Sequence, residues 1–128
     1  MNINEKIEYA LDLKMHQGYN CAQAVTCALK DEIDLDEIYL KEISSAFCAG
    51  MGNLKGTCGA LIGVLMILGL KTKGLNTLKL SKDISDRFEN LSGALVCKDL
   101  KSIKDDKPLC SCNNCIKNAI MAYYEIVS

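Results

Sequence analysis

Hydrophobic residues recur along this chain at the three- and four-residue spacing of amphipathic helices, with almost no alternation of the β type. The spacing predicts a first helix over about Ile3 to His16, which Gly18 should end. A second helix should begin after Asn20, because Asn20 and Gln23 have the spacing of a capping box. A third helix is expected to begin at Asp34.

The second half of the chain is expected to hold the centre of the fold. Its most apolar stretch, Cys58 to Leu70, has 13 residues without a charge and follows the candidate cap Thr57. A helix that is apolar all round is contacted on every side, so this segment is predicted to be central. Further helices are expected over about Thr77 to Leu91 and from about Asn114 onward, with Cys97 on a short helical or irregular piece between them.

These elements predict an all-α fold, a compact single-domain bundle of five to six helices around the central apolar helix. The chain has 128 residues, the length of one ordinary domain, so residues 1–128 are expected to form a single helical domain.

Charge and targeting signals narrow the classes of function. The net charge of −1 gives no electrostatic reason to expect nucleic acid or an anionic membrane as a partner. No membrane insertion is expected, because the apolar stretch is too short to cross a bilayer. The N-terminal residues lack the apolar core of a signal peptide, which makes the cytoplasm the expected location.

Cysteine is the outlier of the composition, with eight residues in the chain. A reducing cytoplasm keeps thiols reduced, and a chain of this length can fold without disulfides. The cysteines therefore indicate metal binding or redox chemistry rather than a structural disulfide framework.

Three cysteines fall at predicted helix starts: Cys21, Cys58 and Cys115. A helix start presents free N–H groups and a partial positive charge, and both stabilise a thiolate, which is the nucleophile and the metal ligand. Cys112 and Cys115 also form a C-x-x-C, a spacing used by dithiol redox pairs and by half of a four-ligand zinc site. Cys110 extends this tract to C-x-C-x-x-C, and the chain has no second C-x-x-C.

Other candidate residues have simpler interpretations. Cys27 and Cys48 lie among apolar residues and are expected to be buried small hydrophobes. His16, the only histidine, is expected to act at a helix C-terminus rather than as a metal ligand. Gly59 and Gly63 are four residues apart, which favours close packing of another helix backbone against this face.

Three features follow one another along the chain: the run from Gly18 to Val25, then Cys58-Gly59-Ala60-Leu61-Ile62-Gly63, and then Cys97 with a late cysteine before the terminal helix. In these features the chain resembles the C_GCAxxG_C_C family of redox-active proteins. Members of that family are small proteins with four hallmark cysteines. The resemblance implies that the hallmark residues here are Cys21, Cys58, Cys97 and Cys115. Cys112 is an alternative to Cys115 for the fourth position, or shares it.

The resemblance implies a redox-active protein that uses clustered thiols in thiol–disulfide exchange or electron transfer, which would make it a thiol-disulfide oxidoreductase. Cys58 is expected to be the leading nucleophile, with Cys21, Cys97 or Cys115 as the resolving thiol. Its partner would be a redox protein or a small thiol. A zinc or iron–sulfur site on Cys21, Cys58, Cys97 and Cys115 is the first alternative. A non-catalytic helical adaptor is the second.

Overall fold

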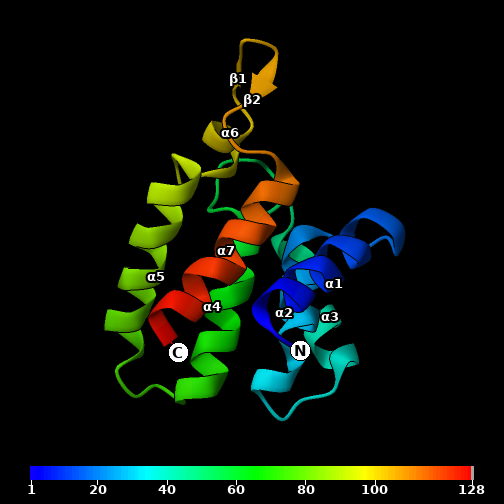
Figure 1. The fold of residues 1–128 in the computed structure, drawn as a ribbon, viewed down its shortest axis with the longest axis vertical. Helices are drawn as coiled ribbons and strands as arrows, with labels where there is room; N and C mark the ends of the chain where they lie inside the picture. The colour runs from blue at the N-terminus through cyan, green and yellow to red at the C-terminus, as the bar shows by residue number, and fades with distance from the viewer. Residues whose placement is uncertain (128) are drawn as a thin grey trace.

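The structure is a computed structural model, and it describes residues 1–127. Helices make up nearly all of its regular structure, which confirms the all-α prediction (Figure 1). The described residues form helices α1 (Ile3–His16), α2 (Cys21–Ala28), α3 (Glu37–Ile43), α4 (Gly59–Thr72), α5 (Thr77–Ser92), α6 (Cys97–Leu100) and α7 (Cys112–Val127). Two 3₁₀ turns, Lys30–Glu32 and Ser45–Phe47, flank α3. Six of these α-helices have seven residues or more, and α6 is a single turn.

Local capping explains where the first two helices begin and end. Asn20 and Gln23 form the predicted capping box, in which each side chain accepts a hydrogen bond from the backbone N–H of the other. Gly18 has a φ of +78° and follows the last residues of α1, as expected of a residue that ends a helix. Cys21 is therefore fixed as the first residue of α2.

Three predicted helix starts are wrong. α3 begins after Asp36 rather than at Asp34. Cys58 itself is the N-cap of α4, because Thr57 has an extended backbone that forms a β-bridge with Val96. α7 begins at Cys112 rather than near Asn114, because the Ser111 hydroxyl accepts the Asn114 N–H at 3.1 Å and caps the helix two residues earlier.

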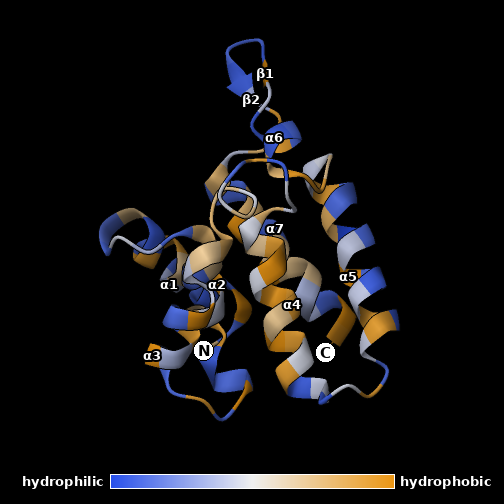
Figure 2. Cartoon of the chain, turned by 180° about the vertical axis from the view of Figure 1, so that it is seen from behind, coloured by the Kyte–Doolittle hydropathy of each residue, from blue (hydrophilic) through white to orange (hydrophobic). Residues whose placement is uncertain are grey.

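Helix α4 lies in the middle of the bundle and packs against α2, α5 and α7. Figure 2 shows hydrophobic residues along α4 and hydrophilic residues on the outer side of α5. The expectation that α4 is contacted on every side is only partly met, since Met66 is half-buried and Leu70 is exposed. No helix among residues 1–127 is long and apolar enough to cross a membrane.

A small hairpin of two antiparallel strands, β1 (Ile103–Lys104) and β2 (Lys107–Pro108), projects from one end of the bundle (Figure 1). This hairpin was not predicted from the sequence. Asp105 and Asp106 both have positive φ angles, which is the backbone of a type I′ turn. The hairpin connects α6 to α7 and so joins two of the segments that carry cysteines.

Candidate functional site

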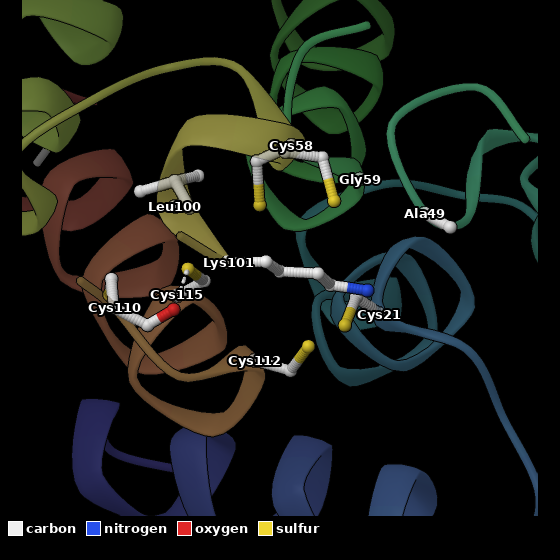
Figure 3. A pocket seen from close by; sticks show the side chains of 10 residues that line it. Cys21, Ala49, Cys58, Gly59, Leu100, Lys101, Cys110, Cys112 and Cys115 are labelled. Carbon is white, nitrogen blue, oxygen red and sulfur yellow. Dashed lines mark hydrogen bonds between the residues drawn. The ribbon is translucent and has the colours of Figure 1, made fainter. Parts of the chain in front are cut away.

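Six of the eight cysteines line one cavity at the end of the bundle from which the hairpin projects (Figure 3). They are Cys21, Cys58, Cys97, Cys110, Cys112 and Cys115. The cavity has a volume of about 30 Å³, room for only a water molecule or two. All six are free thiols.

Helix amino ends meet at this cavity. Cys21 and Cys112 are the first residues of α2 and α7, and Cys58 is the N-cap of α4. The unpaired N–H groups of a helix start and the positive end of its dipole favour a thiolate over a thiol. The bundle therefore collects, in one place, several helix ends that stabilise negative charge on sulfur.

The loop before α4 holds Cys58 next to Cys97. The Cys58 N–H donates to the Leu95 carbonyl at 2.8 Å, and the Cys97 N–H donates to the Gly56 carbonyl at 3.0 Å. Gly50 makes this loop possible: its φ is +57°, and a Cβ there would lie 2.5 Å from the Cys97 Cβ.

Gly59 and Gly63 allow close packing around the start of α4, as the sequence predicted. A Cβ on Gly63 would meet the Ala22 carbonyl of α2 at 3.1 Å. A Cβ on Gly59 would lie 2.4 Å from the Phe47 carbonyl, which belongs to the 3₁₀ turn rather than to another helix. The glycines therefore bring α2 and the 3₁₀ turn against the helix end that carries Cys58.

Cys58 and Cys115 form the first interacting pair of thiols. The pKa of Cys58 is lowered to about 7, first by hydrogen bonding from Cys115 and then by the backbone N–H groups of Ala60 and Leu61, which together outweigh burial. The same hydrogen bond, together with burial, raises the pKa of Cys115. Cys58 is therefore the more acidic thiol of this pair, and Cys115 is the less acidic one.

Cys21 and Cys112 form the second pair, and their sulfurs point toward one another in Figure 3. The pKa of Cys112 is lowered to about 6, first by hydrogen bonding from Cys21 and then by the ammonium groups of Lys101 and Lys14, which together outweigh burial. Hydrogen bonding to Cys112, followed by burial, raises the pKa of Cys21. Cys112 is therefore the more acidic thiol of this pair, and its side chain is only half-buried.

Cys97 and Cys110 border the two pairs. Burial raises the pKa of Cys97, and no hydrogen bond to another thiol contributes to that shift. The buried Cys110 lies beside Cys115, whose thiol donates to the Cys110 carbonyl at 3.8 Å. The Cys110 sulfur accepts a hydrogen bond from the Asn118 amide at 3.7 Å.

The structure thus brings together every cysteine that the sequence analysis singled out: Cys21, Cys58, Cys97, Cys112 and Cys115. Cys27 and Cys48 do not line the cavity; Cys27 is fully buried as expected, whereas Cys48 is only half-buried, so the expectation of burial is wrong for Cys48. Cys110 and Lys101 also line the cavity, which was not predicted from the sequence. The C-x-C-x-x-C spacing was the available signal for Cys110, whereas an exposed lysine in a charged loop gives none.

The arrangement of the thiols also bears on the zinc or iron–sulfur alternative. Within residues 1–127, no three cysteine, histidine or acidic side chains form a group that could hold a metal ion. A structural zinc site needs four converging ligands. Hydrogen bonds between thiols join these cysteines in two pairs, and Cys21 of one pair also interacts with Cys58 of the other.

Comparison with known proteins tests which family this chain belongs to. No curated protein and no solved structure matches the chain. A family profile described as "Putative redox-active protein (C_GCAxxG_C_C)" matches residues 19–126, which include all six cavity cysteines. The match covers far more than half of the 128 residues. The chain therefore belongs to the C_GCAxxG_C_C family.

Proposed function

We propose that this protein performs thiol–disulfide exchange with the cysteines of the cavity. One observation carries the proposal: Cys21, Cys58, Cys112 and Cys115 line one small cavity, where Cys21 interacts with Cys112 and Cys58 with Cys115, and one thiol of each pair is the more acidic. Exchange needs a thiolate to attack a disulfide and a neighbouring thiol to resolve the mixed disulfide. Each pair supplies both groups.

Cys112 is the better placed of the two thiolates to meet a partner, because it is half-buried whereas Cys58 is only 5% exposed. The Cys112 thiolate attacks one sulfur of a partner disulfide, forms a mixed disulfide and releases the other sulfur as a thiolate. Cys21 then loses its proton and attacks Cys112, forming the Cys21–Cys112 disulfide and releasing the first sulfur. The partner is reduced by two electrons, and this pair is oxidised by two.

The raised pKa of Cys21 does not prevent this second step. Its first cause is the hydrogen bond to the Cys112 thiolate. Once Cys112 carries a covalent bond to the partner, its negative charge is gone, so that cause disappears. The ammonium group of Lys14 also lowers the pKa of Cys21.

The size of the cavity limits the class of partner. A space of about 30 Å³ cannot admit a peptide or a glutathione molecule. The partner is therefore a redox protein or a small thiol compound whose disulfide reaches Cys112 from the surface. In this proposal the chain works in the cytoplasm, where glutathione and protein thiols would return the pair to its reduced state.

A redox titration tests the proposal. The reduced full-length chain is equilibrated without air in buffers of increasing oxidised to reduced glutathione ratio, and the free thiols are alkylated and counted by mass spectrometry. We expect thiols to disappear two at a time. The Cys48→Ser variant, altered outside the cavity, should lose the same thiols at the same ratios.

Two results would contradict the proposal. One is a chain that keeps all eight thiols over the whole range of buffers. The other is zinc that binds the reduced chain and protects four cavity thiols from alkylation, which would favour the metal alternative.

A further inference from the structure

The two thiol pairs differ in access to solvent, and a single helix turn connects them. Cys21 and Cys112 are both half-buried, whereas Cys58 and Cys115 are buried. Cys112 and Cys115 lie three residues apart in the first turn of α7, where side chains are neighbours, with about 5–6 Å between Cβ atoms. Cys115 thus lies beside the accessible pair through Cys112, and it lines the same small cavity as Cys58, with which it shares a hydrogen bond.

We infer that the cavity is a disulfide relay, in which a disulfide formed at Cys21–Cys112 moves through Cys112–Cys115 to the buried Cys58–Cys115 position. This inference rests on the proposed exchange function and assigns Cys115 as the transfer residue. It also sets the number of electrons that one chain can exchange. Each chain takes up two disulfides, one in each pair, and so exchanges four electrons.

The transfer balances within the chain. Cys115 first passes its proton to the Cys58 thiolate. The Cys115 sulfur then attacks Cys112, so that the Cys112–Cys115 bond forms and Cys21 leaves as a thiolate. Cys58 passes that proton on to Cys21 and attacks Cys115; the Cys58–Cys115 bond forms, and Cys112 leaves as a thiolate. In the net reaction the disulfide moves from Cys21–Cys112 to Cys58–Cys115. One proton moves from Cys115 to Cys21, and one negative charge moves from Cys58 to Cys112.

The charges near the thiols favour transfer of the disulfide from Cys21–Cys112 to Cys58–Cys115. Cys112 is a good leaving group in the last step, because Lys101 and the start of α7 stabilise its thiolate. After the transfer, Cys21 is again a thiol beside the Cys112 thiolate, which is the state that attacks a partner. The accessible pair is thereby ready for a second disulfide while the first is held where solvent does not reach it.

A second route needs to be distinguished from this one. The charge of Cys58 also raises the pKa of Cys21, so those two groups are near enough to interact. Direct attack of Cys58 on Cys21 would produce a Cys21–Cys58 disulfide without using Cys115. The two routes predict different trapped species when Cys115 is removed.

The test follows the disulfides in time. The reduced full-length chain receives one equivalent of oxidised glutathione without air, samples are quenched with acid and alkylated, and peptide mass spectrometry locates each disulfide. In the unaltered chain we expect Cys21–Cys112 first and Cys58–Cys115 later, with the first species declining as the second grows. A second equivalent should fill both positions.

Variants separate the steps. Cys115→Ser should stop at Cys21–Cys112 and consume one equivalent, and Cys115→Ala should do the same. Cys112→Ser should slow oxidation of Cys58 by roughly tenfold or more, because glutathione then lacks its accessible thiolate. Cys48→Ser should follow the unaltered time course, and circular dichroism checks that each variant is folded.

The outcomes distinguish the relay from the function on which it rests. A Cys21–Cys58 disulfide in Cys115→Ser, or Cys58–Cys115 forming at the normal rate in Cys112→Ser, overturns the relay and leaves exchange standing. Simultaneous appearance of both disulfides in the unaltered chain also overturns the relay. If glutathione is not consumed and no disulfide forms, the relay and the proposed function both fail.

Discussion

Adding a methyl group at three glycines of α4 should produce three different changes in stability. A Cβ at Gly59 would lie 2.4 Å from the Phe47 carbonyl oxygen, about 1 Å closer than the ordinary contact of 3.4 Å. A Cβ at Gly63 would lie 3.1 Å from the Ala22 carbonyl, so a shift of a few tenths of an ångström suffices. A Cβ at Gly69 meets no atom within 4 Å.

The expected free energies follow from these distances. Overpacking a tight site costs about 1–3 kcal/mol, and the Gly59 contact is with backbone, which yields least. Replacing glycine by alanine inside a helix otherwise stabilises it by about 0.5–1 kcal/mol. We therefore expect Gly59→Ala to destabilise by about 1–3 kcal/mol, Gly63→Ala to change little, and Gly69→Ala to stabilise by up to about 1 kcal/mol.

Urea denaturation followed by circular dichroism measures the three free energies of unfolding, with Gly69→Ala as the matched control on the same helix. Gly59→Ala should also raise the pKa of Cys58, because displacing the start of α4 moves the Ala60 and Leu61 N–H groups away from its sulfur. If Gly59→Ala is as stable as Gly69→Ala, the close approach of the 3₁₀ turn to α4 is wrong.

Three further predictions concern charge and burial. Lys101→Gln should move the midpoint of Cys112 alkylation to higher pH, because the lysine stabilises the thiolate. Added salt should reduce the difference in midpoint between Lys101→Gln and the unaltered chain. An unchanged midpoint would mean that Lys101 does not act on Cys112. Lys6 is 4% exposed and ion-paired, so Lys6→Met should lower the free energy of unfolding by about 1–3 kcal/mol. Lys82→Met, which removes one partner of an exposed ion pair, is the control and should leave that free energy nearly unchanged in the same urea assay. Burial raises the pKa of Cys27 to about 11, so at pH 8 this thiol should resist iodoacetamide until guanidinium unfolds the chain. Fast labelling of Cys27 in the native protein would contradict this prediction.

The sequence by itself determined the helices and the family. Helical spacing of apolar residues predicted α1, α2, α4 and α5 close to their observed positions, because each must bury one face to form. The Asn20 capping box and Gly18 fixed two ends through local hydrogen bonds and backbone angles alone. Element order and the Cys-Gly-Ala-x-x-Gly run were sufficient for the family resemblance, which the profile match confirmed.

Local signals failed where a residue's partner is distant in the sequence. Thr57 has the chemistry of an N-cap, yet its backbone pairs with Val96, so Cys58 takes the capping position. The start of α7 depends on Ser111, whose competing neighbours Asn113 and Asn114 are equally good caps in isolation. Local propensities are weak compared with a tertiary hydrogen bond, so they place a helix better than they place its first residue.

Only the tertiary structure decided how the thiols are paired. The sequence places Cys112 and Cys115 together as one C-x-x-C, whereas the fold gives each a separate partner, Cys21 and Cys58. Which thiols meet depends on how α2, α4 and α7 converge, and the side-chain packing that sets this convergence has no local signature. The same convergence brings Cys21 and Lys101 to Cys112, and both lower the pKa of this accessible cysteine.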